Sequence, residues 1–350
     1  MALAARDYSL NGEEAKRAIA NGLAGAKWYA SSIPRKRMKE LMARSDGPAL
    51  RDTALWLGLT LLVGALGIYT WGTWAAVPVF IVYGVLYGSA SDSRWHECGH
   101  GTPFKTRWYN DVVYQIASFM VLKEPTVWRW SHSRHHTDTI IVGRDREIIA
   151  YRPPNFVEMF LDLFNISGGF QELRSIVRHA FGRLSEEEKG FIPEMEHGKV
   201  FLTARIYVAI YAAVIALSMA SASWLPLMLV GLPSFYGAWL KYLFGVTQHA
   251  GLAEDVLDHR LNSRTIMMNP VFRFLYWNMN YHVEHHMFPM VPYHALPKLH
   301  EEMKHELPQV YPSTVAAYRE IIPALLKQRK NPAYFIQREL PSTATPMAAE

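Results

Sequence analysis

Two long stretches of the chain contain no charged side chain. The first runs from Thr53 to Ser91, and the second runs from Ile206 to Leu240. At ~1.5 Å per residue, a helix over the first stretch would be about 58 Å long, nearly twice the ~30 Å hydrocarbon layer of a bilayer. Because helices of soluble proteins seldom run so far without charge, the pattern predicts membrane-spanning helices rather than helix pairs buried in a soluble core.

A short polar turn divides each uncharged stretch into two arms. The first turn is Thr70–Thr73, flanked by Tyr69 and Trp74, and the second turn is Ser221–Ser223. Aromatic rings are favoured at the boundary between membrane and water. The predicted spans are residues 53–69, 74–91, 206–220 and 224–241. We therefore predict an all-α integral membrane protein with four transmembrane helices in two hairpins.

Basic residues are concentrated outside the two hairpin turns. Neither turn contains Lys or Arg, whereas the N-terminal segment, the segment between the hairpins and the C-terminal third are rich in both. Loops on the cytoplasmic side of a membrane carry such an excess. We therefore expect these three regions to be cytoplasmic and to form a helical cap. The amphipathic stretch Phe156–Leu184 is expected to lie along the membrane surface or to pack beneath it.

The predicted domain organisation has three segments. Residues 1–52 form a cytoplasmic N-terminal segment in which no signal peptide is evident. Residues 53–310 form the membrane domain, and residues 311–350 form a C-terminal helix followed by a flexible tail rich in Pro, Ala and Thr.

The composition narrows the possible chemistry. Cys98 is the only cysteine, which excludes an intrachain disulfide, a thiolate metal site and a cysteine-ligated iron–sulfur cluster in this chain. The net charge of +5 is explained by basic cytoplasmic loops, and no basic patch interleaved with aromatic residues indicates nucleic-acid binding.

Three histidine clusters follow the predicted hairpins. They are His96 and His100; His132, His135 and His136; and His282, His285 and His286. Positions i, i+3 and i+4 share one face of a helix, so each cluster can direct two or three imidazoles toward one point. With 15 histidines in 350 residues, composition alone does not explain two H-x-x-H-H patterns and a third cluster. His249, at the end of the fourth predicted span, is a ninth candidate ligand.

Nine histidines exceed the needs of a single metal ion. A structural zinc ion takes four ligands, and a catalytic zinc ion usually takes three and a water molecule. Nine imidazoles therefore suit two metal ions with positions left open for O₂. Nearby acids could accept the distal ring N–H of a ligand instead of binding metal, and the alternative for each is a solvated or salt-bridged acid: Glu97, Glu284, Asp138, Asp145 and Glu147. The histidines without clustered spacing are interpreted as surface or structural residues: His179, His197, His259, His294, His300 and His305.

One competing motif overlaps the first cluster. His96, Glu97 and His100 match the H-E-x-x-H pattern of zinc proteases, in which the glutamate is the general base. This interpretation leaves the second and third clusters without a role, so we favour it less. A metal-binding or transport protein is a further alternative, but it would need ionisable residues deep within the spans, and the two uncharged stretches argue against this.

The three clusters resemble the histidine boxes of the membrane fatty-acid desaturase and hydroxylase superfamily. These boxes have the forms H-x(3–4)-H, H-x(2–3)-H-H and (H/Q)-x(2–3)-H-H, and this chain carries them in that order. His249 occupies the place of an additional ligand upstream of the third box. The similarity extends from the first span to about residue 310, and residues 248–260 and 278–292 look most like bacterial members.

The resemblance implies an enzyme with two non-haem iron ions that uses O₂ to attack unactivated C–H bonds. It implies a lipid or hydrophobic small-molecule substrate and a separate electron donor, of the ferredoxin or cytochrome b5 type with its reductase. We expect a fatty acid desaturase in a bacterial inner membrane, with the active site on the cytoplasmic side. The alternative is a hydroxylase, monooxygenase or oxidative dealkylase of a hydrocarbon or a small molecule in a catabolic pathway, because both outcomes follow from one oxidant and differ in substrate placement.

Overall fold

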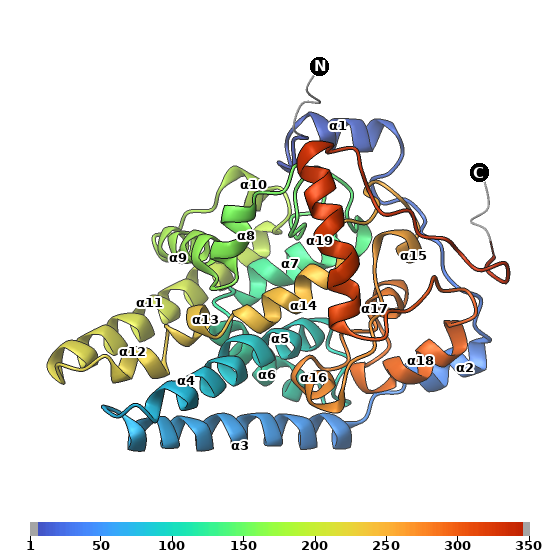
Figure 1. The fold of residues 1–350 in the computed structure, drawn as a ribbon. Coiled ribbons are helices and arrows are strands. Elements are labelled where there is room, and N and C mark those ends of the chain that lie inside the picture. Colours follow the sequence, from blue (N-terminus) through green and yellow to red (C-terminus); the bar gives the residue numbers. More distant parts are fainter. Residues whose placement is uncertain (1–5, 346–350) are drawn as a thin grey trace. The chain divides into compact units, whose positions relative to one another are not determined.

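The computed structural model describes residues 6–345 as helices joined by loops, and it contains no β-strand within that range (Figure 1). The predicted all-α fold is therefore confirmed. Residues 1–5 of the predicted N-terminal segment and residues 346–350 of the predicted tail lie outside the described residues. The chain divides into two compact units: unit 1 is Met1–Arg44, Ser131–Phe156 and Phe244–Glu350, and unit 2 is Ser45–Trp130 and Val157–Leu243.

Unit 2 contains both uncharged stretches. Its helices are α3 (Asp46–Thr70), α4 (Ala76–Gly84), a π-helix (Val85–Ser89), α5 (Ala90–His100), α6 (Arg107–Met120), the first part of α7 (Pro125–Thr137), most of α8 (Phe156–Asp162), α9 (Ile166–Ala180), α10 (Glu186–Lys189), a 3₁₀ turn (Glu194–Glu196), α11 (His197–Ala220), α12 (Leu225–Leu229), α13 (Pro233–Tyr236) and the start of α14 (Trp239–His249).

Within residues 6–345, two helical segments are long and apolar enough to cross a membrane. They are Arg35–Thr70, which includes α3, and Glu194–Ala220, which includes α11. Only 28% and 17% of their most apolar windows are buried, whereas the core helix of a soluble protein is mostly buried. These segments contain the predicted arms 53–69 and 206–220.

The second arms differ from each other. Residues 76–100 are continuously helical, because the π-helix Val85–Ser89 joins α4 directly to α5. Residues 224–241 are instead divided among α12, α13 and the start of α14, so this stretch is not one continuous helix. Pro226 and Pro233 lack a backbone N–H, and Gly231 has φ 96, a conformation outside the α-helix.

A close backbone contact joins the two hairpins within unit 2. A Cβ atom on Gly237 would lie 1.9 Å from the carbonyl oxygen of Gly84, so α13 can approach α4 only because both positions are glycine. Ser89 of the π-helix donates a hydrogen bond to the Gly237 carbonyl at 2.5 Å and accepts one from the Lys241 backbone N–H at 2.9 Å.

Unit 1 contains α1 (Glu13–Ala20), α2 (Arg35–Leu41), the end of α7, the end of α14, α15 (His259–Asn262), α16 (Pro270–Leu275), α17 (His282–Met287), a 3₁₀ turn (Tyr293–Ala295), α18 (Leu296–Met303) and α19 (Thr314–Lys330). Its main apolar core packs α17 against α18 and includes Val283, Leu296 and Leu299. This core lies beside the third histidine cluster and supports α17, which has only six residues.

Both ends of the described chain pack on unit 1. Arg6 forms an ion pair with Glu254 at 2.9 Å, and Tyr8 donates a hydrogen bond to the same carboxylate. Near the C-terminus, Ile336 donates its backbone N–H to the carbonyl of Gly251. The spatial units cut across the three segments predicted from the sequence, whose functional roles remain predictions.

Candidate metal centre

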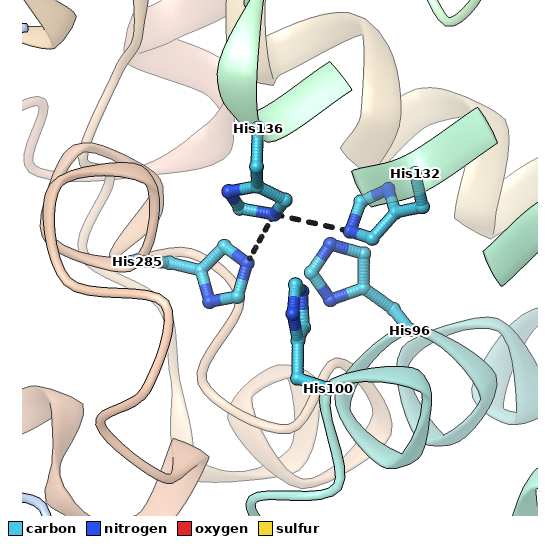
Figure 2. A group of neighbouring side chains, drawn as sticks. All are labelled: His96, His100, His132, His136 and His285. Carbon is cyan, nitrogen blue, oxygen red and sulfur yellow. Dashed lines mark hydrogen bonds between the residues drawn. The ribbon is translucent and has the colours of Figure 1, made fainter. Parts of the chain in front are cut away.

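The second histidine cluster lies on the last turns of α7. The Nε2 atoms of His132 and His136 are one helical turn apart in sequence and lie 3.1 Å from each other (Figure 2). His135 lies between them along the chain but on a different face, and its Nδ1 contacts Asp145. The helical spacing of the cluster thus divides its three imidazoles between two directions.

The third cluster forms the short helix α17, and all three of its imidazoles are buried. The Nε2 atoms of His282 and His286 lie 3.0 Å apart. His285 points the other way, and its Nε2 lies 3.1 Å from Nε2 of His136 (Figure 2). The third cluster therefore divides between two directions in the same manner as the second.

One group of four histidines lies entirely within unit 1. It consists of His135, His249, His282 and His286, whose candidate ligand atoms all lie within 4.8 Å of one another. Burial, followed by the neighbouring imidazoles, lowers the pKa of His249, His282 and His286 well below its ordinary value. Neutral imidazole is the form that binds metal ions.

The nitrogen spacing in this group fits a metal ion. Two ligand nitrogens ~2.1 Å from a metal and at right angles would be about 3.0 Å apart. The Nε2 atoms of His282 and His249 lie 2.9 Å apart, and those of His286 and His282 lie 3.0 Å apart. A buried set of imidazoles with facing lone pairs is the donor chemistry that suits iron, zinc or copper.

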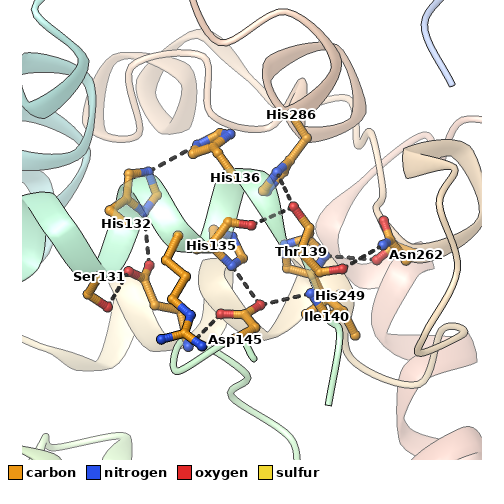
Figure 3. Close-up of polar contacts among 12 residues, drawn as sticks. Ser131, His132, His135, His136, Thr139, Ile140, Asp145, His249, Asn262 and His286 are labelled. Atoms are coloured by element: carbon orange, nitrogen blue, oxygen red, sulfur yellow. Dashed lines mark hydrogen bonds and ion pairs between the residues drawn. The ribbon is translucent and has the colours of Figure 1, made fainter. Parts of the chain in front are cut away.

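Hydrogen bonds at Nδ1 hold the rings of this group. Asp145, which is buried, accepts from His135 Nδ1 at 2.8 Å and from the Ile140 backbone N–H at 2.8 Å (Figure 3). His249 Nδ1 donates to the Asn262 carbonyl at 2.8 Å. A proton on Nδ1 leaves the lone pair on Nε2, which is the nitrogen that faces the group.

Thr139 orients a third ring in the same way. Its hydroxyl donates to the His135 carbonyl at 2.6 Å, so its oxygen accepts from Nδ1 of His286 at 3.2 Å (Figure 3). This again leaves Nε2 of His286 with its lone pair. Three of the four imidazoles thus have an identified partner that selects the tautomer required of a metal ligand.

The second set of histidines in unit 1 comprises His132, His136 and His285 (Figure 2). Nδ1 of His132 contacts Glu147 at 2.9 Å, and the same glutamate accepts a hydrogen bond from Ser131 at 3.0 Å. The neighbouring Nε2 atoms and the carboxylate behind His132 repeat the arrangement around His135 and Asp145.

The first cluster belongs to unit 2. His96 and His100 project from successive turns of α5, and their ring centroids are 5.2 Å apart (Figure 2). Nδ1 of His96 lies 3.3 Å from the buried carboxylate of Glu97. Helix α5 ends at Gly101, whose positive φ of 66 closes the helix directly after His100.

The acidic residues divide into two kinds. Asp145, Glu147 and Glu97 lie against histidine ring nitrogens, as the sequence predicts. Glu284 instead accepts hydrogen bonds from Thr265 and His300, and Asp138 accepts from Arg144 and from the backbone of Gly25. Glu284 and Asp138 therefore take the alternative role of a paired acid, because their partners are His300 and Arg144 instead of a histidine of the three clusters.

Two histidines without clustered spacing lie close to these sites. His259 is buried between Trp28, whose ring stacks on it at 4.2 Å, and His286, whose ring centroid is 5.1 Å away. His300 is buried against Glu284. Helical periodicity in the sequence does not predict that His259 or His300 lies near the histidine groups, because their contacts with His286 and Glu284 join separate segments of the chain.

The gathering of the second and third clusters bears on the zinc-protease interpretation. That interpretation leaves both clusters without a role. In unit 1, His282 and His286 of the third cluster instead join His135 of the second in one buried group. The H-E-x-x-H motif therefore explains too little of the structure.

Comparison with known proteins gives a consistent result. The sequence model of the family described as "Fatty acid desaturase" matches residues 72–318, more than half of the chain. A probable fatty acid desaturase of Sorghum bicolor is 25% identical over 77% of this chain and 72% of its own length. An omega-6 fatty acid desaturase of Glycine max is 34% identical over 24% of this chain and 22% of its own length. An sn-1 oleoyl-lipid 12-desaturase of Anabaena variabilis is 26% identical over 36% of this chain and 37% of its own length.

Proposed function

Because the chain belongs to the fatty acid desaturase family, we propose that it is a membrane-bound, O₂-dependent oxidoreductase that desaturates fatty acyl chains at a di-iron centre. The single observation that supports this most strongly is the buried group of His135, His249, His282 and His286. Bound iron would activate O₂ for removal of hydrogen from an unactivated C–H bond, a reaction that protein side chains do not perform alone.

We propose that the nine histidines divide between two iron ions. His135, His249, His282 and His286 would hold one ion. His132, His136 and His285 would contribute to the other, and His96 and His100 would complete its ligand set. The support for His96 and His100 is their helical spacing and their place as the first of three boxes along the chain.

The protein's own contribution to the chemistry is position and a dry surrounding. Asp145 and Glu147 hold their histidine rings, and Asn262 and Thr139 select tautomers. Burial lowers the pKa of His249, His282 and His286, which favours their neutral form. Nine imidazoles leave room in two coordination spheres for O₂, because iron accepts more than four or five ligands.

The partners and location belong to the same proposal. The substrate is a lipid acyl chain, and electrons come from a separate donor of the ferredoxin or cytochrome b5 type. The four predicted spans would place the chain in a bacterial inner membrane, with the helical cap and the iron ions on the cytoplasmic side. Two apolar helical segments and the positive-inside distribution of Lys and Arg support this placement.

The test begins with the purified protein in detergent or nanodiscs. Metal analysis should find about two iron ions per chain, and a reductant with an electron donor should drive O₂ consumption. Mass spectrometry of lipids from cells with and without the gene should then reveal acyl products with two fewer hydrogens. Addition of oxygen instead would identify the hydroxylase alternative, and one zinc ion without O₂ consumption would defeat both.

A further inference from the structure

Helix α9 in unit 2 has two apolar faces, and only one of them is packed. Ile176 is fully buried with Leu122, Ala204 and Tyr207 in a core that joins α9 to α11. On the other face, Phe170, Val177 and Phe181 are exposed, with 78% of Phe181 accessible. An apolar face left in water is costly, so the second face needs an occupant.

The packed face holds α9 in a fixed orientation. At its start, Asn165 donates a side-chain hydrogen bond to the Ser234 carbonyl at 3.2 Å, and Gly169 packs so closely on Phe235 that a Cβ atom would lie 2.6 Å from its ring. At its end, the Ala180 carbonyl accepts a hydrogen bond from Arg205 Nε at 3.1 Å. The exposed face cannot turn inward without breaking these contacts.

The exposed face combines aromatic rings with basic side chains. Phe170, Arg174, Val177 and Phe181 follow the spacing i, i+4, i+7 and i+11, which forms one stripe along a helix. The neighbouring helix α8 exposes Phe160 in addition. Aromatic rings beside basic groups are typical of helices that lie in a bilayer interface.

An open groove lies at the end of this stripe. It measures about 620 Å³ and is lined by Arg174, Val177, Arg178, Phe181 and Arg183. Arg178 is already paired with Glu188 at 2.7 Å. Within residues 6–345, the guanidinium groups of Arg174 and Arg183 form no ion pair or hydrogen bond, so two cationic groups beside apolar side chains are available to a ligand.

Contact with α11 places this groove at a defined depth. Arg205 is the last charged residue before a stretch that remains uncharged to the end of α11 at Ala220, about 22 Å at ~1.5 Å per residue. A charged side chain here belongs at the edge of the hydrocarbon layer. Because Arg205 bonds the end of α9, the groove would lie at the level of lipid headgroups when α11 spans the bilayer.

We propose that the exposed stripe of α9 enters the bilayer interface and that Arg174 and Arg183 bind the phosphate of an anionic phospholipid. Phe170, Val177 and Phe181 would contact its acyl chains. This inference rests on the proposed membrane location and adds a specific lipid site to it. A bilayer fits this surface better than an acidic protein partner, because the other face of α9 packs on α11, a helix that is apolar enough to span a membrane.

Lipid retention tests the proposed phosphate site. Protein in nanodiscs of phosphatidylcholine mixed with phosphatidylglycerol is extracted, and the lipids that remain bound are measured by native mass spectrometry. Arg174→Gln/Arg183→Gln should retain phosphatidylglycerol roughly tenfold less than the wild type. Arg174→Lys/Arg183→Lys should retain most of it. The control Lys27→Gln/Lys298→Gln removes the same charge from exposed positions of unit 1 and should have no effect.

The depth of α9 is measured separately by spin labelling. Because Cys98 is the only cysteine and is buried, a cysteine introduced by Phe181→Cys can be labelled selectively. The label should be more accessible to O₂ than to a water-soluble nickel chelate, and the label of a Lys189→Cys control should show the reverse.

Three results would overturn the proposal. The first is equal lipid retention by Arg174→Gln/Arg183→Gln and by its control. The second is a label at position 181 that is more accessible to the nickel chelate than to O₂. The third is a raised KM for the electron donor in Arg174→Gln/Arg183→Gln without loss of bound lipid. The last result would assign the groove to an acidic protein. Absence of iron from the wild type would instead defeat the proposed function, and lipid retention would still be measurable.

Discussion

Asp145 accepts a hydrogen bond at 2.8 Å from Nδ1 of His135, which precedes it by 10 residues. The carboxylate comes from the loop after α7 and is held in turn by the Ile140 backbone N–H. A loop residue thus sets the orientation of a helical imidazole, as in metal sites where a carboxylate behind a histidine strengthens the ligand.

Replacing Asp145 with asparagine should weaken iron binding while preserving the fold. The amide keeps the size of the side chain but removes the charge that favours a proton on His135 Nδ1, so iron affinity should fall about 10- to 100-fold. Iron content after dialysis against a weak chelator measures the change. Asp138→Asn is the matched control, because Asp138 pairs with Arg144 rather than with a histidine ring. Equal iron loss from both variants would show that Asp145 has no specific role.

Replacing His282 with alanine should remove the metal from the four-histidine group and abolish O₂ consumption. His282 lies 2.9 Å from His249 and 3.0 Å from His286 between Nε2 atoms, so no other side chain can take its place. His305→Ala is the control, because His305 is mostly exposed. Wild-type O₂ consumption by His282→Ala would contradict the metal assignment.

Removing the metal should lower the thermal stability of the protein. A cation separates imidazole lone pairs that otherwise face one another in a buried site, and a ligand that binds only the folded state stabilises it by mass action. Unfolding followed by intrinsic fluorescence should shift to lower temperature after iron is chelated and should recover when Fe²⁺ is added. If metal analysis shows that iron has been removed and the unfolding temperature is unchanged, the metal does not stabilise the folded protein.

A buried charge cluster at the end of α9 should make stability depend on pH. Burial disfavours protonation of His179, but hydrogen bonds to Glu124 and Glu188 outweigh it and raise the pKa of His179 to about 9. Burial likewise opposes ionisation of Glu188, but His179 and the Ser185 backbone N–H lower its pKa to about 2. Burial raises the pKa of Glu124. Ionisation of that carboxyl therefore reduces the stabilisation of the folded state that the raised pKa of His179 and the lowered pKa of Glu188 provide.

The sign of each contribution follows from these directions. The raised pKa of His179 stabilises the fold fully below about pH 6.5, and this stabilisation is lost as pH rises through about 9. The lowered pKa of Glu188 stabilises the fold above about pH 4.5, and this is lost as pH falls through about 2. The difference in unfolding free energy between wild type and His179→Gln should be roughly 3 kcal/mol near pH 6 and should shrink as pH rises from about 6.5 to about 9. A difference independent of pH would mean that His179 is neutral.

Replacing Gly237 with alanine should destabilise unit 2 by about 3 kcal/mol or more. The new Cβ would lie 1.9 Å from the backbone oxygen of Gly84, which cannot move as a flexible side chain can. Gly58→Ala in α3 is the control, because nothing lies within 4 Å of its new Cβ, and it should be neutral or stabilising by up to ~1 kcal/mol. Equal melting temperatures for the two variants would show that α13 does not depend on this contact.

Much of the fold follows from local patterns in the sequence. The turn at Thr70–Thr73 separates α3 from α4, and the turn at Ser221–Ser223 separates α11 from α12, as predicted. The division of residues 224–241 into three short helices was not predicted. Pro226 and Pro233 were visible in the sequence, but long apolar stretches with proline also occur in continuous spans, where neighbouring helices satisfy the freed backbone groups.

The sequence by itself determined which histidines are candidate ligands, because the 3.6-residue period of a helix places His132 and His136, or His282 and His286, on one face. It also identified His249 as a candidate. Only the tertiary structure decided how the imidazoles are grouped and held. Asp145 rather than Glu284 supports a ligand ring, and His259 lies against His286, because these contacts join loops and helices far apart in the chain. Helical periodicity is a local property, whereas ring orientation depends on the atom that each Nδ1 meets across the fold.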